Sequence, residues 1–192
     1  MNKVVQEIPE SFIKESEAAG NWFSKKEGIE FKVTGIVNPE KVAVNAVSSA
    51  ADTIQQYLYT TNKNNKKELL LHILKDSKLD QVLLFSRTKH GCEKISKHLN
   101  AAGIQTGTIH GDKTQGARTR ALREFKEKDV RILVATDVAA RGIDISNLPF
   151  VVNFDMPTYP NDYIHRIGRT GRAGQEGTAI SLMSVDEHKF LR

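Results

Sequence analysis

Arginine and glycine alternate in one short segment, HRIGRTGRAG, at residues 165–174. A guanidinium group binds phosphate oxygens through paired, charge-assisted hydrogen bonds. An arginine aimed at a transferring phosphoryl group also stabilises the charge of the transition state. The segment therefore predicts a phosphate site. Its arginines and glycines follow one another at three-residue spacing: Arg166, Gly168, Arg169, Gly171, Arg172 and Gly174.

A dinucleotide-binding loop is the competing interpretation of these glycines. That fingerprint has the spacing G-x-G-x-x-G and directly follows a strand. Here the spacing is G-x-x-G-x-x-G, arginines stand between the glycines, and the preceding residues predict a helix. The sequence therefore rejects a dinucleotide site.

A second polar segment is ATDVAARGIDI, at residues 135–145. Thr136 follows an apolar run and offers a hydroxyl and a backbone N–H to a phosphate. Gly142 permits a tight loop, and the carboxylate of Asp144 is suited to accept hydrogen bonds from ribose hydroxyls. Each residue alone could be a turn former or a helix cap, but together they indicate a nucleotide or nucleic-acid contact.

A third segment joins His110-Gly111-Asp112 to Gln115 and Arg118. Gln115 and Arg118 lie three residues apart at the start of a predicted helix and so face the same way. Backbone amides at a helix start also attract anions. The pattern favours a grip on the nucleic-acid backbone, with simple capping and surface charge as the alternative.

These segments follow predicted strands in an alternating series of strands and helices. Such alternation predicts a three-layer α/β domain with a mostly parallel sheet and helices on both faces. In these sheets, ligands gather at the carboxyl ends of the strands. The series consists of strands at 81–86, 104–110, 131–135, 150–154 and 178–183, and helices at 90–102, after Thr114 and at 159–167.

Composition limits the class of protein. The chain has 192 residues, 39% hydrophobic and 27% charged, which is typical of a soluble globular protein. Its single cysteine, Cys92, excludes a disulfide framework and a multi-cysteine zinc site, predicts no metal site, and fits a reducing, cytoplasmic compartment. The net charge is +5, although residues 1–42 carry −1. The basic remainder indicates an anionic partner, unless it is only a solvated face.

Two regions differ in pattern. Residues 1–41 form an N-terminal segment of unclear origin, with a predicted helix at 11–23 and a strand at 29–37 but no chemical motif. Residues 42–192 hold every motif described above. We therefore expect the functional domain to begin near Val42.

The string from Gln81 onward resembles the C-terminal RecA-like domain of DEAD-box RNA helicases. LLFSRT (residues 83–88) is similar to motif IV of that family, and the pair of Gln115 and Arg118 to motif IVa. ATDVAARGID (135–144) is similar to motif V, and HRIGRTGR (165–172) to motif VI. The strings SRTKHG and HGDKTQGARTRAL most resemble the bacterial RhlE branch.

The resemblance implies a role for each matching residue. It implies that Arg169 and Arg172 are arginine fingers, that Asp144 contacts the ATP ribose, and that His165 and Arg141 couple two domains across a cleft. The implied contacts to RNA phosphates and sugars are Gln115, Arg118, Thr136, Thr88 and Gly111. Because phosphate contacts carry no base information, RNA binding is expected to be largely independent of sequence.

The sequence lacks the phosphate-binding G-x-x-x-x-G-K-[ST] motif, the Asp-Glu-Ala-Asp motif and the Ser-Ala-Thr motif. In the family these belong to the first RecA-like domain. The resemblance therefore implies that ATP and Mg²⁺ are bound mainly by that domain, which becomes a partner beside RNA, and that this chain alone does not hydrolyse ATP. The alternatives are a stand-alone RNA-binding or regulatory module, or a domain of a related DNA helicase.

Overall fold

The computed structural model describes residues 54–75, 79–171 and 176–187, all of which belong to one compact unit. The helix predicted at 11–23, the strand predicted at 29–37 and the expected boundary near Val42 lie outside the described residues.

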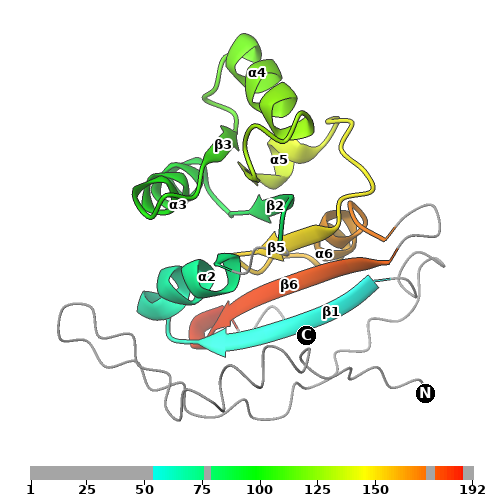
Figure 1. The fold of residues 1–192 in the computed structure, drawn as a ribbon. Helices are drawn as coiled ribbons and strands as arrows, with labels where there is room; N and C mark the ends of the chain where they lie inside the picture. The colour runs from blue at the N-terminus through cyan, green and yellow to red at the C-terminus, as the bar shows by residue number, and fades with distance from the viewer. Residues whose placement is uncertain (1–53, 76–78, 172–175, 188–192) are drawn as a thin grey trace. The chain divides into compact units, whose positions relative to one another are not determined.

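Within the described part of the chain, six strands form one sheet in the order β1-β6-β5-β2-β4-β3 (Figure 1). All neighbouring strands are parallel. The α/β prediction is thus confirmed, with a sheet that is wholly parallel. The strands are β1 (Ile54–Thr61), β2 (Val82–Phe85), β3 (Thr106–Ile109), β4 (Ile132–Ala135), β5 (Phe150–Asn153) and β6 (Gly177–Ser184).

Helices cover both faces of the sheet. Alternate residues of β2 point to opposite faces, so Leu84 packs in one core cluster and Leu83 in another. The first cluster lies under α2 (Lys66–Leu74) and α3 (Lys89–Ala101). The second lies under α4 (Gln115–Lys126) and α5 (Asp137–Ala140), and α6 (Pro160–Ile167) packs on β1 and β6 through a third. The result is the three layers that the alternation predicted.

Capping residues mark the start of α4 and the end of α3, and the helix predicted after Thr114 is confirmed. Thr114 caps α4, since its side chain accepts a hydrogen bond from the backbone N–H of Ala117. Gly103 follows α3 with φ of +82°, a conformation that glycine adopts without steric cost. Cys92 is a buried thiol in the core, and burial raises its pKa to about 12.

The sequence did not predict β1, α2 or α5 as separate elements. Among the described strands, β1 lies at an edge of the sheet and pairs only with β6, and its sequence IQQYLYTT lacks a long apolar run. The short α5 has only four residues, so no helical periodicity can appear in it. Among the described residues, no helix is long and apolar enough to cross a membrane.

Candidate functional site

Three predicted RNA contacts lie at the carboxyl ends of neighbouring strands. Thr88 follows β2, Gly111 follows β3, and Thr136 follows β4, which lies between them. The backbone N–H of Thr136 donates to Ile109 O at 3.3 Å, and this bond holds the ends of β4 and β3 together. Gly111 is exposed, and a Cβ placed on it would meet nothing within 4 Å. A ligand can therefore come close to the protein backbone at Gly111.

Thr88 also has a structural task. Its side chain accepts a hydrogen bond from the N–H of Gly91 at 2.9 Å and so caps α3. Gly91 itself is required there, because a Cβ at this position would lie 2.3 Å from Ser86 Oγ. The structure thus explains part of the SRTKHG string by packing and capping, while the Thr88 side chain stays exposed at the edge.

Gln115 and Arg118 lie together on the first turn of α4, as predicted. Arg118 Nη1 donates to Gln115 Oε1 at 3.3 Å. Arg118 Nε is buried and has no hydrogen-bond partner within the described residues. The pair stands at the end of the loop that carries Gly111, so the five residues predicted to contact RNA share one side of the domain.

A carboxylate on α3 fixes that loop. Glu93 Oε1 accepts hydrogen bonds from Lys113 Nζ at 2.8 Å, His110 Nε2 at 2.7 Å and Thr108 Oγ1 at 3.1 Å. Hydrogen bonds from Lys113 and then His110 lower the pKa of Glu93 to about 2. Lys89 and Asp112 form a second ion pair between α3 and the loop, at 2.8 Å. The Gly111 loop is therefore held electrostatically.

Replacing Glu93 with glutamine should lower the melting temperature at neutral pH. A carboxyl whose pKa is lowered by folding stabilises the fold at pH values above its ordinary pKa of 4.5. This contribution is lost as the pH falls towards the folded pKa of about 2. The difference between wild type and Glu93→Gln should therefore shrink below pH 4.5. Melting curves across this range measure it, with Glu127→Gln, an exposed carboxylate on α4's end, as the control. A difference that stays constant down to pH 2 would contradict the assignment.

Arg169, a predicted ATP contact, packs against the loop that carries Asp144, another predicted ATP contact. Asp144 lies in the loop after α5, and its side chain is 94% exposed. Arg169 follows α6 and donates from Nη1 to the backbone oxygens of Ile143 and Ile145, at 3.4 and 3.5 Å. Arg169 therefore rests on the residues that flank Asp144. Lys126 of α4 also reaches Asp144 Oδ2, at 3.3 Å.

The two residues expected to couple domains are also near each other. Arg141 Nη2 donates to Asp162 Oδ1 on α6. His165 lies three residues after Asp162 on the same helix and is exposed. Arg172, the second expected finger, lies outside the described residues, so its position relative to Arg169 stays a prediction.

One arginine of the predicted phosphate cluster points inward. Arg166 is 1% exposed, and its Nε and Nη2 donate to the two carboxylate oxygens of Asp137 at 2.6 and 2.8 Å. It belongs to the interior of the domain, unlike Arg169. The three-residue spacing could not reveal this, since both residues fit the same pattern.

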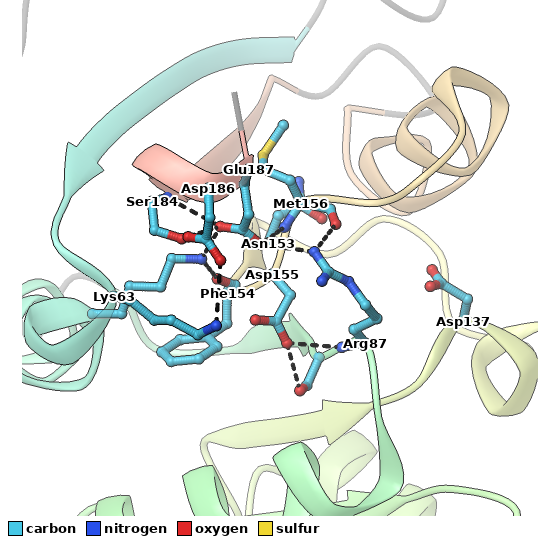
Figure 2. Close-up of polar contacts among 12 residues, drawn as sticks. Lys63, Arg87, Asp137, Asn153, Phe154, Asp155, Met156, Ser184, Asp186 and Glu187 are labelled. Atoms are coloured by element: carbon cyan, nitrogen blue, oxygen red, sulfur yellow. Dashed lines mark hydrogen bonds and ion pairs between the residues drawn. The ribbon is translucent and has the colours of Figure 1, made fainter. Parts of the chain in front are cut away.

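The sequence also did not predict a buried polar cluster at the carboxyl edge, between β5, β6 and β2. The carboxylate of Glu187 pairs there with Lys66 and with Arg87 Nη2, the latter at 2.8 Å, and also accepts the N–H of Met156 at 3.1 Å. Asp155 Oδ2 accepts from Ser86 Oγ and from the N–H of Arg87, both at 2.9 Å. Figure 2 shows Glu187, Met156 and Arg87 converging. This cluster fixes the start of the segment that carries Thr88.

Residues 65–174 match the family described as helicase conserved C-terminal domain. The DEAD-box ATP-dependent RNA helicase CshA of Bacillus subtilis is 42% identical over 157 residues, which are 82% of this chain and 32% of that protein. The crystal structure of the E. coli DEAD-box protein SrmB, bound to regulator of ribonuclease activity A, superposes with a TM-score of 0.68 at 42% identity, over 71% of this chain and 81% of that one. The chain belongs to the DEAD-box helicase C-terminal domains. A DEAD box protein from Methanococcus jannaschii gives a TM-score of 0.69 at 42% identity, over 73% of this chain and 39% of that one.

This helicase C-terminal domain spans about a third of the length of the curated relatives that it matches. Within the described residues, no group of three or more histidine, cysteine, aspartate or glutamate side chains could hold a metal ion. The side chains gathered on the domain are instead hydrogen-bond donors and single carboxylates. These suit contacts to phosphate and ribose oxygens.

Proposed function

We propose that this domain is the C-terminal half of an ATP-dependent RNA helicase. ATP and Mg²⁺ are held mainly by a first RecA-like domain, and this domain closes over them. Arg169 and Arg172 then reach the γ-phosphate, and Asp144 accepts hydrogen bonds from the ribose. The position of Arg169 against the residues around Asp144 supports this assignment.

RNA is held at the carboxyl edge of β2, β4 and β3. A backbone phosphate there meets donors of three kinds: the hydroxyl of Thr136, the guanidinium of Arg118, and the amides at the start of α4. The backbone N–H of Thr136 is already bonded to Ile109 O. Because these groups address phosphates and sugars, binding is largely independent of base sequence. The residues assigned to RNA are Thr88, Gly111, Gln115, Arg118 and Thr136.

His165 and Arg141 complete the arrangement as contacts to the first domain. Closure of the two domains assembles both sites together, and strand separation is driven by that closure. The single observation that carries the proposal is the separation of the candidate residues into two groups on one domain. Arg169, which follows α6, contacts the residues on either side of Asp144, while Thr136 and Gly111 lie at the sheet edge.

Two finer assignments rest on sequence. Placement in the RhlE branch rests on the strings SRTKHG and HGDKTQGARTRAL, part of which capping and packing also require. A reducing, cytoplasmic setting rests on the single, buried Cys92.

The purified chain should bind single-stranded RNA weakly, with an affinity that falls steeply as salt rises, and should not hydrolyse ATP. Each phosphate contact to a single strand contributes about 0.7 to the slope of log affinity against log salt. Titrations of a labelled oligouridylate at several salt concentrations measure the slope, and Arg118→Ala should flatten it by about one unit or less.

Two results would contradict the proposal. Tight RNA binding that ignores salt would indicate base stacking, as expected of a stand-alone RNA-binding module. RNA-stimulated ATP hydrolysis by the chain alone, abolished by Arg169→Ala, would indicate a nucleotide site complete in itself. A matched oligodeoxynucleotide tests the DNA-helicase alternative, which predicts equal or tighter binding of DNA.

A further inference from the structure

The guanidinium of Arg166 is buried at the junction of the two groups of candidate residues. Besides its two bonds to Asp137, its Nη1 donates to Asn153 Oδ1 at 3.2 Å and to the backbone oxygen of Asp155 at 2.7 Å. The ring of Phe85 lies 5.1 Å from the guanidinium carbon. Both carboxylate oxygens of Asp137 are engaged, so the guanidinium and the carboxylate cannot rotate independently.

The partners of Arg166 lead directly to the RNA side. Asp137 is the residue after Thr136 and the first residue of α5. The carboxylate of Asp155, whose carbonyl accepts from Arg166, holds Ser86 Oγ and the N–H of Arg87. The segments that carry Thr136 and Thr88 are therefore both fixed to this one guanidinium.

The backbone of Arg166 leads to the ATP side. Arg166 lies on α6 three residues before Arg169, and the N–H of Arg169 donates to Arg166 O at 3.2 Å. Arg169 in turn contacts the oxygens of Ile143 and Ile145, on either side of Asp144. A displacement of Asp137 thus reaches Arg169 through one side chain and one helical turn.

Stability alone does not account for this arrangement. Burying an ion pair costs so much hydration that apolar residues of the same volume often stabilise a protein as well or better. What a two-pronged ionic contact provides is a fixed relative orientation of the groups that it joins. Here the joined groups are the first turn of α5 and the helix that carries Arg169.

We propose that Arg166 is a positioning residue that transmits RNA binding at Thr136 to Arg169, through its two-pronged contact with Asp137. The inference rests on the proposed function and adds to it the route by which RNA controls the ATP side. An RNA phosphate at Thr136 displaces the start of α5. The Asp137–Arg166 pair then passes that displacement to α6 and so to Arg169.

Amide NMR of the full 192-residue chain, titrated with a single-stranded oligouridylate, tests the transmission. In the wild type, RNA should shift the amide of Gly111, which reports binding, and the amide of Arg169, which reports transmission. In the double variant Asp137→Asn/Arg166→Met, which leaves no buried charge unpaired, the Gly111 shift should remain and the Arg169 shift should be lost. Arg166→Lys keeps the positive charge but cannot make the two-pronged contact with Asp137, so it should lose the Arg169 shift too. This variant replaces the double variant in the test if the double variant does not fold.

The matched control is Lys66→Met/Glu187→Gln, which neutralises another buried ion pair at the same edge of the sheet. It should keep both shifts. An Arg169 shift that survives in Asp137→Asn/Arg166→Met, or disappears equally in the control, would overturn the inference. In the wild type, a shift at Gly111 without one at Arg169 would overturn the inference alone. No shift at either amide would overturn the proposed RNA binding as well.

Discussion

Replacing Arg169 with alanine should lower kcat of the proposed two-domain helicase by about 10³-fold or more while changing the KM for ATP much less. Arginine fingers contribute roughly 10³–10⁵ in rate because they meet charge that develops only as the phosphoryl group is transferred. An interaction made only in the transition state lowers kcat and kcat/KM together when it is removed. Arg172→Ala should behave in the same way, since it stands in the same segment. Steady-state ATP hydrolysis at saturating RNA measures both.

In the same assay, Arg118→Ala tests whether the residues assigned to RNA act separately from those assigned to ATP. It removes a proposed RNA contact at the start of α4, so it should raise the RNA concentration needed for half-maximal stimulation and leave kcat at saturating RNA nearly unchanged. The matched control is Arg123→Ala, an exposed arginine near the other end of α4 that pairs with Glu127. If Arg118→Ala mainly cuts kcat while Arg169→Ala mainly weakens RNA binding, the two surfaces are assigned in reverse.

Strands and helices with a strong local pattern could be predicted from the sequence. The apolar runs at residues 81–86 and 131–135 became β2 and β4, and the helical spacing after Thr114 became α4. β1 could not be predicted in this way, because an edge strand needs few apolar residues and its position depends on pairing with β6, more than a hundred residues away. Elements whose stability comes from distant partners leave a weak local pattern.

The same limit applies to the candidate site. Spacing placed Gln115 and Arg118 together correctly, because residues three apart on a helix always share a face. Spacing also put Arg166 and Arg169 in one phosphate-binding cluster. In the structure, however, Arg166 points into the core, where it binds Asp137, the first residue of α5. Which of two equivalent arginines faces inward is decided by a partner that the local sequence does not contain.

The buried cluster around Glu187 depends even more on distant partners. Its cation Lys66 is 121 residues away in sequence, at the start of α2, and Lys66 also donates to Phe154 O at 2.7 Å. A lysine in a run such as KNNKK reads as exposed, yet Lys66 is 3% exposed. Its ammonium lies 5.4 Å from the ring of Phe154, which shields it from water.

Replacing Glu187 with glutamine should destabilise the domain by about 3–5 kcal/mol, because removing one partner of a buried pair leaves the other charge without compensation. Burial alone would raise the pKa of Glu187, but the hydrogen bonds from Lys66 and Ser184 outweigh it and lower the pKa. The carboxylate therefore stabilises the fold at pH values above its ordinary pKa of 4.5, and this contribution is lost as the pH falls below 4.5. Urea unfolding at neutral pH, followed by circular dichroism, measures the loss.

The neighbouring carboxylate gives a matched control for that experiment. Asp186 pairs with Lys63 at 3.2 Å, but both side chains are mostly exposed, so Asp186→Asn should change the unfolding midpoint little. The double variant Lys66→Met/Glu187→Gln removes the stranded charge and should recover much of the stability that Glu187→Gln loses. Equal losses in Glu187→Gln and in the double variant would show that the pair itself, rather than the uncompensated ammonium, determines the stability. If Glu187→Gln and Asp186→Asn changed the unfolding midpoint equally, burial of the Lys66–Glu187 pair would have no energetic consequence, which would contradict the prediction.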